Sequence, residues 1–488
     1  MNKPNEKGIA LILTLILVLV MSVMAVSLMF LSQTETWSSM NYRLMSQARD
    51  GAEAGVNATA NYLVNTYVPP TGATLTSAYN SNVSPVQAPN TSTSGNDVIL
   101  SASALRTANY PDSTITSAFS TAGQGSLTAG YTSVKYSSYA KLLNQQAIVP
   151  YGTTTPVTVQ TWQIISDGTI GGVRSADEEV SAILERQITP VFAYAAFASD
   201  NGCSALTFGG GGTTDSYDSS TVVAGAVTTQ AYGGNVGTNG NLSTNGNPTT
   251  INGNLSTPRT GVGTCTAGNV TAWTAGSGHV NGTILELPQP VTYPLPVIPS
   301  PGTQDLSLGH NATCPTGVDA ITGCTASNSD IYIPPGSYRD INITGNETVH
   351  VSAGTYNINS FREQSAQSAL VIDSGPVIFK VTGNNVSGSV VDLTGNSVQN
   401  ATLNPMNFQM LYAGTGSVSL KGNSQASGLL YAPLATFSFA GQADWYGAVI
   451  GASLTDMGGA AIHYDRRLGG TAYTISNYML DSFTWQKY

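Results

Sequence analysis

An uninterrupted apolar run near the amino terminus constrains this chain more than any other feature. After a short leader that contains Lys3 and Lys7 and ends at Gly8, the run extends from Ile9 to Leu31 without a charged residue. A helix needs about 20 apolar residues to cross the hydrocarbon core of a bilayer, so the run is long enough to span a membrane. The positive leader places the amino end in the cytoplasm and the rest of the chain outside.

A cleaved secretory signal is the alternative, since residues 25–27 loosely fit a small-x-small cleavage site. The helical pattern, however, continues beyond the apolar run, with apolar residues every four positions at Met40, Leu44, Ala48, Ala52 and Val56. No proline interrupts it before Pro69. We therefore predict one helix over residues 9–65, about 85 Å long, whose first half sits in lipid and whose second half docks on a soluble domain.

The residues of this region resemble those of type IV pilin-like proteins. The leader ending in Gly8, the apolar helix directly after it and the amphipathic stretch from Gln47 to Gly55 are similar to the amino-terminal region of the PilX group of minor pilins and pilus assembly proteins. The resemblance implies that a prepilin peptidase cuts between Gly8 and Ile9 and that the new amino terminus is methylated. It also implies that the helix contacts other pilin subunits and resides in the inner membrane before assembly.

Two positions differ from the pattern of major pilins, which usually begin with phenylalanine and carry glutamate at the fifth mature position. Here those positions hold Ile9 and Leu13. Without the glutamate, the subunit lacks the carboxylate that would pair with a neighbouring amino terminus. The resemblance, which covers about 60 of the 488 residues, therefore implies a tip or minor role instead of bulk filament.

Composition narrows the range of partners. Charged residues make up only 9% of the chain, the formal net charge is −10, and Lys and Arg together number 17. Phosphate binding needs clustered basic residues, so nucleic acid is excluded as a partner. With so few charged residues, the polar surface of the protein must consist mainly of the hydroxyl and amide groups of Ser, Thr and Asn. A surface of this kind is typical of secreted β-rich proteins.

Four cysteines lie on the expected outer side of the membrane: Cys203, Cys265, Cys314 and Cys324. None shows the CxxC spacing of a zinc site, and an even number in an oxidising compartment favours two disulfides. Cys314 with Cys324 would close a short loop and leave Cys203 with Cys265. Free thiols are the alternative.

Residues 66–198 are expected to form a variable region and a small β head. The stretch from Tyr67 to Thr128 reads as loosely structured, because it is rich in Ser, Thr, Asn and Ala. Strand-like residues 157–166 and 180–188 flank the turn-rich segment 167–172, which predicts a hairpin. The resulting small antiparallel sheet would cover the amphipathic half of the helix.

From residue 199 onward, short apolar triplets alternate with Gly and Asn. Residues 239–244 (NGNLST) recur as residues 252–257, thirteen positions later. Repeats of this kind indicate a solenoid, in which Asn and Gly form the corners and the following Leu points into a core of stacked coils. A proline-rich connector over residues 287–299 should be extended and strap one segment to the next.

Residues 301–488 continue this pattern as a β-solenoid domain. Nine strand candidates lie at residues 330–336, 341–346, 349–351, 370–372, 377–381, 390–393, 418–423, 429–433 and 448–451. Their length favours a large right-handed parallel β-helix or a similar β-solenoid. Residues from about 325 to 468 also resemble an uncharacterised carboxy-terminal domain often found behind PilX-like amino termini. The fold class is therefore α+β followed by all-β.

Some parallel β-helices are polysaccharide lyases or hydrolases, which gather carboxylates on one face. The only acidic and basic cluster that the sequence of this region indicates contains Asp444, Asp456, Asp465, Arg466 and Arg467, which read better as strand-end caps and a solvated terminus. No catalytic, metal or cofactor motif is recognisable.

We expect a non-catalytic minor pilin-like subunit that assists pilus assembly and displays the solenoid for adhesion to a surface or carbohydrate ligand. A permanently anchored envelope protein and a tethered polysaccharide-active enzyme are the alternatives.

Overall fold

The chain folds into two compact units. The computed structural model describes residues 6–71, 78–88, 96–129, 132–172, 174–223, 225–316, 320–393, 398–422, 425–442, 444–456 and 458–487. The first unit contains Met1–Ile148, Val157–Gln187 and Asn477–Tyr488, and the second contains Val149–Pro156 and Ile188–Ser476. The segments expected at 199–300 and 301–488 are not separate units, because buried residues of both share one apolar core.

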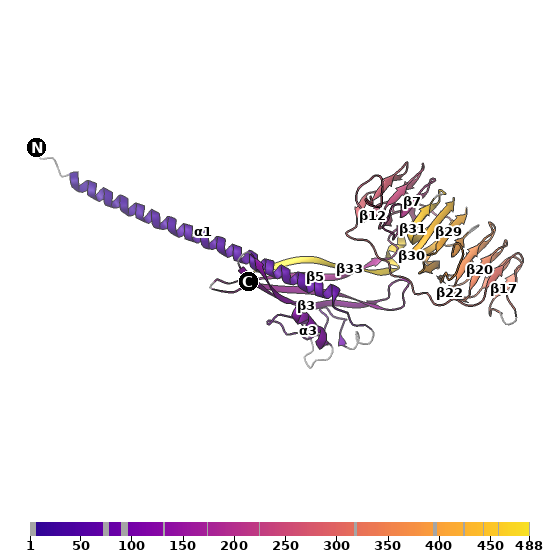
Figure 1. Ribbon diagram of the computed structural model, residues 1–488, viewed down its shortest axis with the longest axis horizontal. Helices are drawn as coiled ribbons and strands as arrows, with labels where there is room; N and C mark the ends of the chain where they lie inside the picture. Colours follow the sequence, from indigo (N-terminus) through magenta and orange to yellow (C-terminus); the bar gives the residue numbers. More distant parts are fainter. Residues whose placement is uncertain are drawn as a thin grey trace. The chain divides into compact units, whose positions relative to one another are not determined.

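The first unit begins with the long helix that the sequence predicted. Helix α1 spans Glu6–Asn65, which corresponds to about 90 Å (Figure 1). Within its apolar half, the hydroxyl groups of Thr14 and Ser22 donate to the carbonyls of Leu11 and Val18, so these polar side chains need no outside partner. The helix ends four residues before Pro69, as expected.

The amphipathic half of α1 packs on an antiparallel sheet of the first unit. The sheet follows the order β1-β3-β4-β5-β33, with β2 paired to β3. Its strands are β1 (Ile99–Ser101), β2 (Gln124–Ala129), β3 (Thr132–Ile148), β4 (Val157–Ile170), β5 (Ala176–Pro190) and β33 (Tyr473–Lys487). Ala48, Ala52 and Val56 of the helix are fully buried, whereas Met40, at the start of the predicted stripe, is exposed.

The small head differs from the sequence prediction in two details. The hairpin of β4 and β5 is confirmed, but β4 continues through Gly168 to Ile170, where a turn was predicted. Residues 113–122, predicted to be loosely structured, form helix α3 (Ser113–Ala122). The carboxylate of Asp112 caps this helix by accepting from the backbone of Thr114 and Ile115, and its apolar face buries Phe119.

The second unit is a large sheet-rich region of short strands. They are β6 (Ala196–Ala198), β7 (Leu206–Phe208), β8 (Thr213–Tyr217), β9 (Val236–Thr238), β10 (Leu242–Thr244), β11 (Thr250–Ile251), β12 (Leu255–Thr257), β13 (Trp273–Ala275), β14 (His279–Val280), β15 (Ile284–Glu286), β16 (Leu306–Leu308), β17 (Thr325–Ser327), β18 (Asp330–Ile333), β19 (Gly336–Ser337), β20 (Asp340–Ile343), β21 (Thr348–Val351), β22 (Gly354–Ile358), β23 (Ser360–Glu363), β24 (Ala369–Ile372), β25 (Val377–Val381), β26 (Val391–Leu393), β27 (Val398–Gln399), β28 (Phe408–Tyr412), β29 (Ser417–Gly422), β30 (Gln425–Gly441), β31 (Asp444–Asp456) and β32 (Ala461–Asp465). Short 3₁₀ turns η1 (Ser219–Thr221), η3 (Pro405–Asn407) and η4 (Arg466–Gly470) connect some of them. All nine strand candidates of the carboxy-terminal region contain observed strands.

Apart from β17, which pairs antiparallel with β18, these strands pair in parallel with a regular topology, which we call the parallel ladder. From β6 to β15, each strand pairs with the one three positions later: β6 with β9, β7 with β10, and β8 with β11. The same step recurs at β22 with β25 and at β23 with β26. Buried Val, Ile, Leu and Phe side chains alternate with outward polar ones, so each coil adds a layer to one core.

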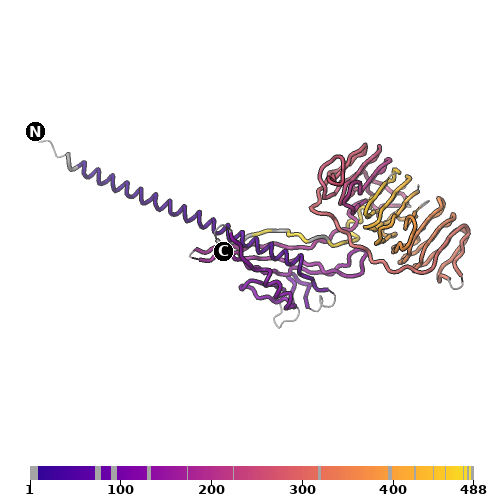
Figure 2. The backbone as a smooth tube through the Cα atoms, viewed as in Figure 1, coloured from indigo at the N-terminus to yellow at the C-terminus, as the bar shows by residue number. Residues whose placement is uncertain are grey.

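The order of coils along the ladder is not the order of the sequence. Strands β31 and β32, from the end of the second unit, pair in parallel with β6, β7 and β8 from its beginning. Figures 1 and 2 show these yellow strands in the middle of the stack, between the magenta and the orange coils. We call this junction the seam. The two ends of the ladder are therefore formed by β13–β15 and by β16–β19, from the middle of the sequence.

The two copies of the thirteen-residue repeat do not stack on each other, although the sequence predicted stacked coils. The copies contain β10 and β12, which do not pair with each other, since β10 lies between β7 and β13 and β12 between β9 and β15. The copies therefore form two different sides of the same coil. Leu242 and Leu255, the apolar residue of each copy, are fully buried, as predicted.

The proline-rich connector joins the two ends of the ladder. Its backbone is tied to Asn239, whose carboxamide donates to the carbonyl of Val291 (2.8 Å) and accepts from its amide (2.7 Å). Further along, the Tyr431 hydroxyl donates to the carbonyl of Pro294 (2.6 Å). The connector contains no strand from Leu287 to Asp305 and lies along several coils, which supports the predicted strap.

Two disulfides lie near the ends of the ladder. Cys203 is joined to Cys265, with Cα atoms 5.7 Å apart, and Cys314 to Cys324, with Cα atoms 5.8 Å apart. These are the two pairs suggested by the sequence. Cys265 precedes β13 and Cys314 follows β16, so each bridge ties down a loop of an end coil.

Candidate functional site

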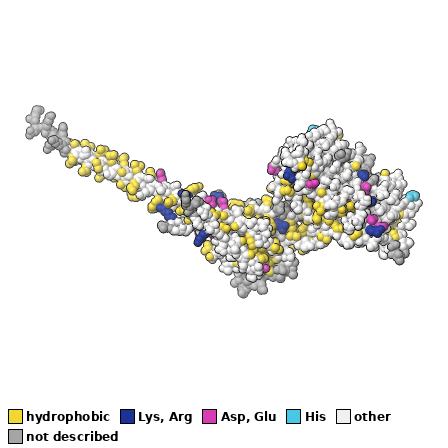
Figure 3. Space-filling view, viewed as in Figure 1, with side chains coloured by type: hydrophobic (Ala, Val, Ile, Leu, Met, Phe, Trp, Pro, Cys, Tyr) yellow, Lys and Arg dark blue, Asp and Glu magenta, His cyan; other side chains and the backbone are white. Residues whose placement is uncertain are grey.

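The exposed half of α1 is the first candidate for a functional surface. Large apolar side chains cover it from Ile9 to Leu31, and Figure 3 shows them as a continuous apolar rod. Ile9, the expected mature amino terminus, is 64% exposed, and Leu13 is 61% exposed. Gly8 lies within the helix. Exposing so large an apolar surface to water is energetically unfavourable, so the segment requires lipid or other apolar helices around it.

Membrane crossing agrees with the dimensions of this helix. Among the described residues, the helical stretch Ile9–Asn65 is the one long and apolar enough to cross a bilayer. Its most apolar window has a mean hydropathy of 3.1 and is not buried by the rest of the chain. The helix therefore has the properties of an anchor.

A second candidate is a polar hollow on the parallel ladder, with a volume of about 360 Å³. It lies where several coils turn the same corner, before β20, before β23 and after β25. Its lining consists of Arg339, Asp340, Asn342, Asn359, Ser360, Arg362, Asn384, Asn385, Val386 and Ser387. Neighbouring coils place Asp340 beside Ser360 and Asn342 beside Arg362. The hollow is thus a short column of polar side chains.

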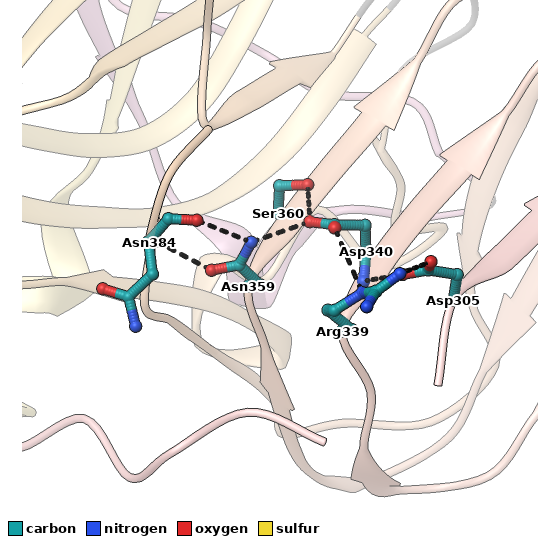
Figure 4. Close-up of polar contacts among 6 residues, drawn as sticks. All are labelled: Asp305, Arg339, Asp340, Asn359, Ser360 and Asn384. Atoms are coloured by element: carbon teal, nitrogen blue, oxygen red, sulfur yellow. Dashed lines mark hydrogen bonds and ion pairs between the residues drawn. The ribbon is translucent and has the colours of Figure 1, made fainter. Parts of the chain in front are cut away.

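Asp340 is the centre of the hydrogen-bond network in this hollow (Figure 4). One of its carboxylate oxygens accepts from the hydroxyl of Ser360 (2.5 Å) and from the carboxamide of Asn359 (2.9 Å). Asn359 in turn accepts from the backbone amide of Asn384 (2.7 Å) on the following coil. Three successive coils are therefore locked together by side chains at one corner.

Arg339 holds the outer end of the network. Its Nε donates to Asp305 Oδ1 (2.6 Å), its Nη2 contacts the other oxygen of Asp305, and its Nε lies 3.7 Å from Asp340 Oδ2. The hydrogen bond from Arg339 lowers the pKa of Asp305, so the carboxylate stays charged at neutral pH. Half of the Arg339 side chain is exposed, which leaves part of its guanidinium open to a ligand.

Arg362 borders the other side of the hollow. Its Nη2 donates to the carbonyl of Ser387 (2.6 Å) and its Nε to that of Ser389 (3.1 Å), so the guanidinium is fixed in place. This site was not predicted from the sequence, and the prediction that the residues around Asp444 are the only charged cluster is wrong. The reason is that Asp305, Arg339 and Arg362 come together only through the pairing of the coils.

The charged residues that the sequence singled out do not form one site. Asp456 is fully buried and accepts from the backbone amides of Gly458 and Ala460 (both 3.3 Å), and burial raises its pKa to about 7. Asp465 caps η4 by accepting from the backbone amide of Arg467. These two carboxylates act as strand-end caps, as expected.

Asp444 belongs to a different cluster, at the seam. The ring of His463 stacks on Tyr446, with centroids 4.3 Å apart, and its Nδ1 lies 2.5 Å from Asp215 Oδ1. Its Nε2 faces Asp444 Oδ1 at 3.8 Å. Burial lowers the pKa of His463, but the hydrogen bonds and charges of the two aspartates outweigh it and raise the pKa to about 9. The ring is therefore charged at neutral pH.

Metal and thiol chemistry find no support in the described part of the chain. It contains no group of three or more His, Cys, Asp or Glu side chains that could hold a metal ion. Both cysteine pairs are disulfides.

Two family models match parts of the sequence. The PilX N-terminal model matches residues 7–57, and a domain of unknown function (DUF7305) matches residues 325–471. No curated protein matches the chain. Among solved structures, the competence-associated pilin ComZ from Thermus thermophilus is similar at 14% identity, over 75% of this chain and 88% of that chain, with a TM-score of 0.28.

The first match falls on the helix whose apolar half is exposed and whose other half packs on the small sheet. The second match covers much of the ladder, including the polar hollow, and its description assigns no activity. The amino-terminal helix of this chain is therefore similar to the PilX N-terminal family.

Proposed function

We propose that this protein is a minor pilin-like subunit of a type IV pilus or a related secretion filament. One observation carries the proposal: the segment that matches the PilX N-terminal model is a single helix whose apolar half is uncovered. Such a helix sits in the inner membrane first and among the helices of other pilin subunits after assembly. The amino end faces the cytoplasm, and the bulk of the chain is periplasmic or extracellular.

Processing follows from the same helix. A prepilin peptidase removes residues 1–8 by cutting between Gly8 and Ile9, and the amino group of Ile9 is methylated. Leu13 supplies no carboxylate to a neighbouring amino terminus, which favours a place at the tip or a low copy number over the shaft.

The parallel ladder is a β-solenoid in this proposal, which its three-strand step supports. Its role is display: it contacts a surface or a carbohydrate ligand while the helix holds the subunit in the filament. Catalysis is not part of the role, because the carboxylates near the seam serve as caps and as partners of His463.

Intact mass and amino-terminal sequencing of the purified protein test the proposal. We expect the chain to begin at Ile9 and to be one methyl group heavier than the cut sequence. In Gly8→Val, a branched side chain stands at the cleaved bond and should block the cut, whereas the matched control Ala10→Val should be processed. An uncut Met1 in the wild type would instead favour a permanently anchored envelope protein.

A further inference from the structure

We propose that the polar hollow around Arg339 and Asp340 binds a segment of a neutral glycan through pairs of neighbouring hydroxyl groups. The inference rests on the proposed role in surface contact and names its ligand. Hydroxyl groups of a sugar donate and accept at once, so they are matched by donors and acceptors that alternate closely. The hollow offers this mixture in guanidinium, carboxamide, carboxylate and hydroxyl groups.

Three carboxamides in the hollow are available to a ligand. The side chains of Asn342, Asn384 and Asn385 line it and make no hydrogen bond to any other described residue, whereas the carboxamide of Asn359 is engaged by the backbone of Asn384. A carboxamide offers a donor and an acceptor side by side, the spacing that two neighbouring hydroxyls can satisfy together. Arg362 is already held by the carbonyls of Ser387 and Ser389, so a ligand that contacts it meets a fixed group.

Charge favours a neutral ligand over an anionic one. Arg339 is paired with Asp305 and Asp340, and the coil after Arg362 places Asp392 beside it in register. The positive charges of the hollow are therefore balanced locally, and the whole chain carries a net charge of −10. A polyanion such as nucleic acid or an acidic polysaccharide would be repelled at long range and would find no excess of positive charge on arrival.

The spacing of the coils suits an extended chain of sugars. Paired strands lie roughly 4.8 Å apart, close to the length of one pyranose ring, so successive sugars would meet successive coils at the same corner. The lining includes one apolar side chain, Val386, and no aromatic ring on which a sugar could stack. Each site should therefore bind weakly, with a Kd on the order of millimolar, and retention on a surface should need several copies.

The test uses the full chain in detergent micelles, attached in many copies to beads and applied to an array of defined neutral and acidic oligosaccharides. We expect a subset of neutral oligosaccharides to retain the beads. Asn342→Ala and Arg362→Gln should each weaken binding about fivefold, the loss of one hydrogen bond. Lys380→Gln is the matched control, because Lys380 lies on β25, outside the hollow, and its removal should leave binding unchanged.

Two results would overturn the inference: no neutral oligosaccharide retains the wild-type beads, or both hollow variants bind as well as the wild type. Retention only by acidic oligosaccharides would also overturn it. Thermal unfolding of each variant shows whether lost binding reflects lost folding, and Ser387→Tyr, which fills the hollow without removing a charge, provides an independent block. Processing at Gly8 is scored on the same samples, so a normally cut protein that binds no glycan refutes the ligand and not the pilin-like role.

Discussion

The charge on His463 should stabilise the seam, and its removal gives the sharpest test of how the ladder holds together. His463 and Asp444 come from the end of the second unit, and Asp215 comes from its beginning. A charged imidazole between two carboxylates therefore joins coils that are far apart in the sequence. His463→Gln keeps a polar side chain of similar size but removes the charge.

The magnitude follows from the pKa of His463, which is raised from 6.5 to about 9. Each pKa unit corresponds to about 1.4 kcal/mol, so the charge contributes roughly 3 kcal/mol to the free energy of unfolding. Because the pKa is raised in the folded state, this contribution is complete below about pH 6.5 and is lost as the pH rises through about 9. For a unit of this size, it corresponds to a shift of roughly 5–8 °C in Tm.

Thermal unfolding of the full chain from about pH 6 to about pH 10 measures the effect. The wild type should lose stability over this range, and His463→Gln should start lower and lose less. The matched control is His279→Gln, because His279 is exposed at an end strand. Since the chain has four histidines, NMR titration of their ring protons gives the pKa of His463 directly. A value near 6.5, or a variant with the pH slope of the wild type, would refute the reasoning.

Three further predictions address other parts of the molecule. Gly168→Ala should destabilise the first unit by about 1–3 kcal/mol in chemical unfolding, because the added Cβ would lie 1.9 Å from the carbonyl oxygen of Ala48. Gly171→Ala is the control and should leave the stability unchanged, because its added Cβ would have no atom within 4 Å. Glu363→Gln should raise the Tm near pH 8 and leave it unchanged near pH 4. Burial raises the pKa of Glu363 to about 9, so near pH 8 folding must protonate a carboxylate that is ionised in the unfolded chain, and glutamine removes this cost. An equal shift at both pH values would contradict this. Leu13→Glu should increase the number of copies per filament in quantitative immunoblots of sheared pili if the missing carboxylate limits incorporation, and Leu17→Glu, one turn on, should not.

The sequence predicted the long helix and the short strands of the second unit, but not helix α3 or the order in which the strands pair. The apolar run and Pro69 defined the helix, and the triplets bounded by Gly and Asn marked the strands, because both signals are local. Pairing between β31 and β6 depends on contacts across most of the second unit. Short apolar strands of similar composition offer no local signal that selects one neighbour over another, so the seam could not be predicted.

The functional candidates divide in the same way. Gly8, Ile9 and Leu13 lie on one continuous helix, so their distances from one another follow directly from their separation in the sequence. The polar hollow depends on coils of unequal length that bring Asp305, Arg339 and Arg362 to one corner, and loop lengths do not reveal which corner they share. His463 was visible in the sequence, but its partner Asp215 lies 248 residues away.

The seam has a consequence for how such a ladder can change its length. Both free ends of the ladder are encoded near the proline-rich connector, between Glu286 and Leu306, while the first and last coils of the unit are fixed against each other. A gene that gains or loses coils beside the connector would lengthen or shorten the ladder and leave the helix, the small sheet and the seam intact. Truncation from the carboxy terminus would instead remove the middle of the ladder and separate its two halves.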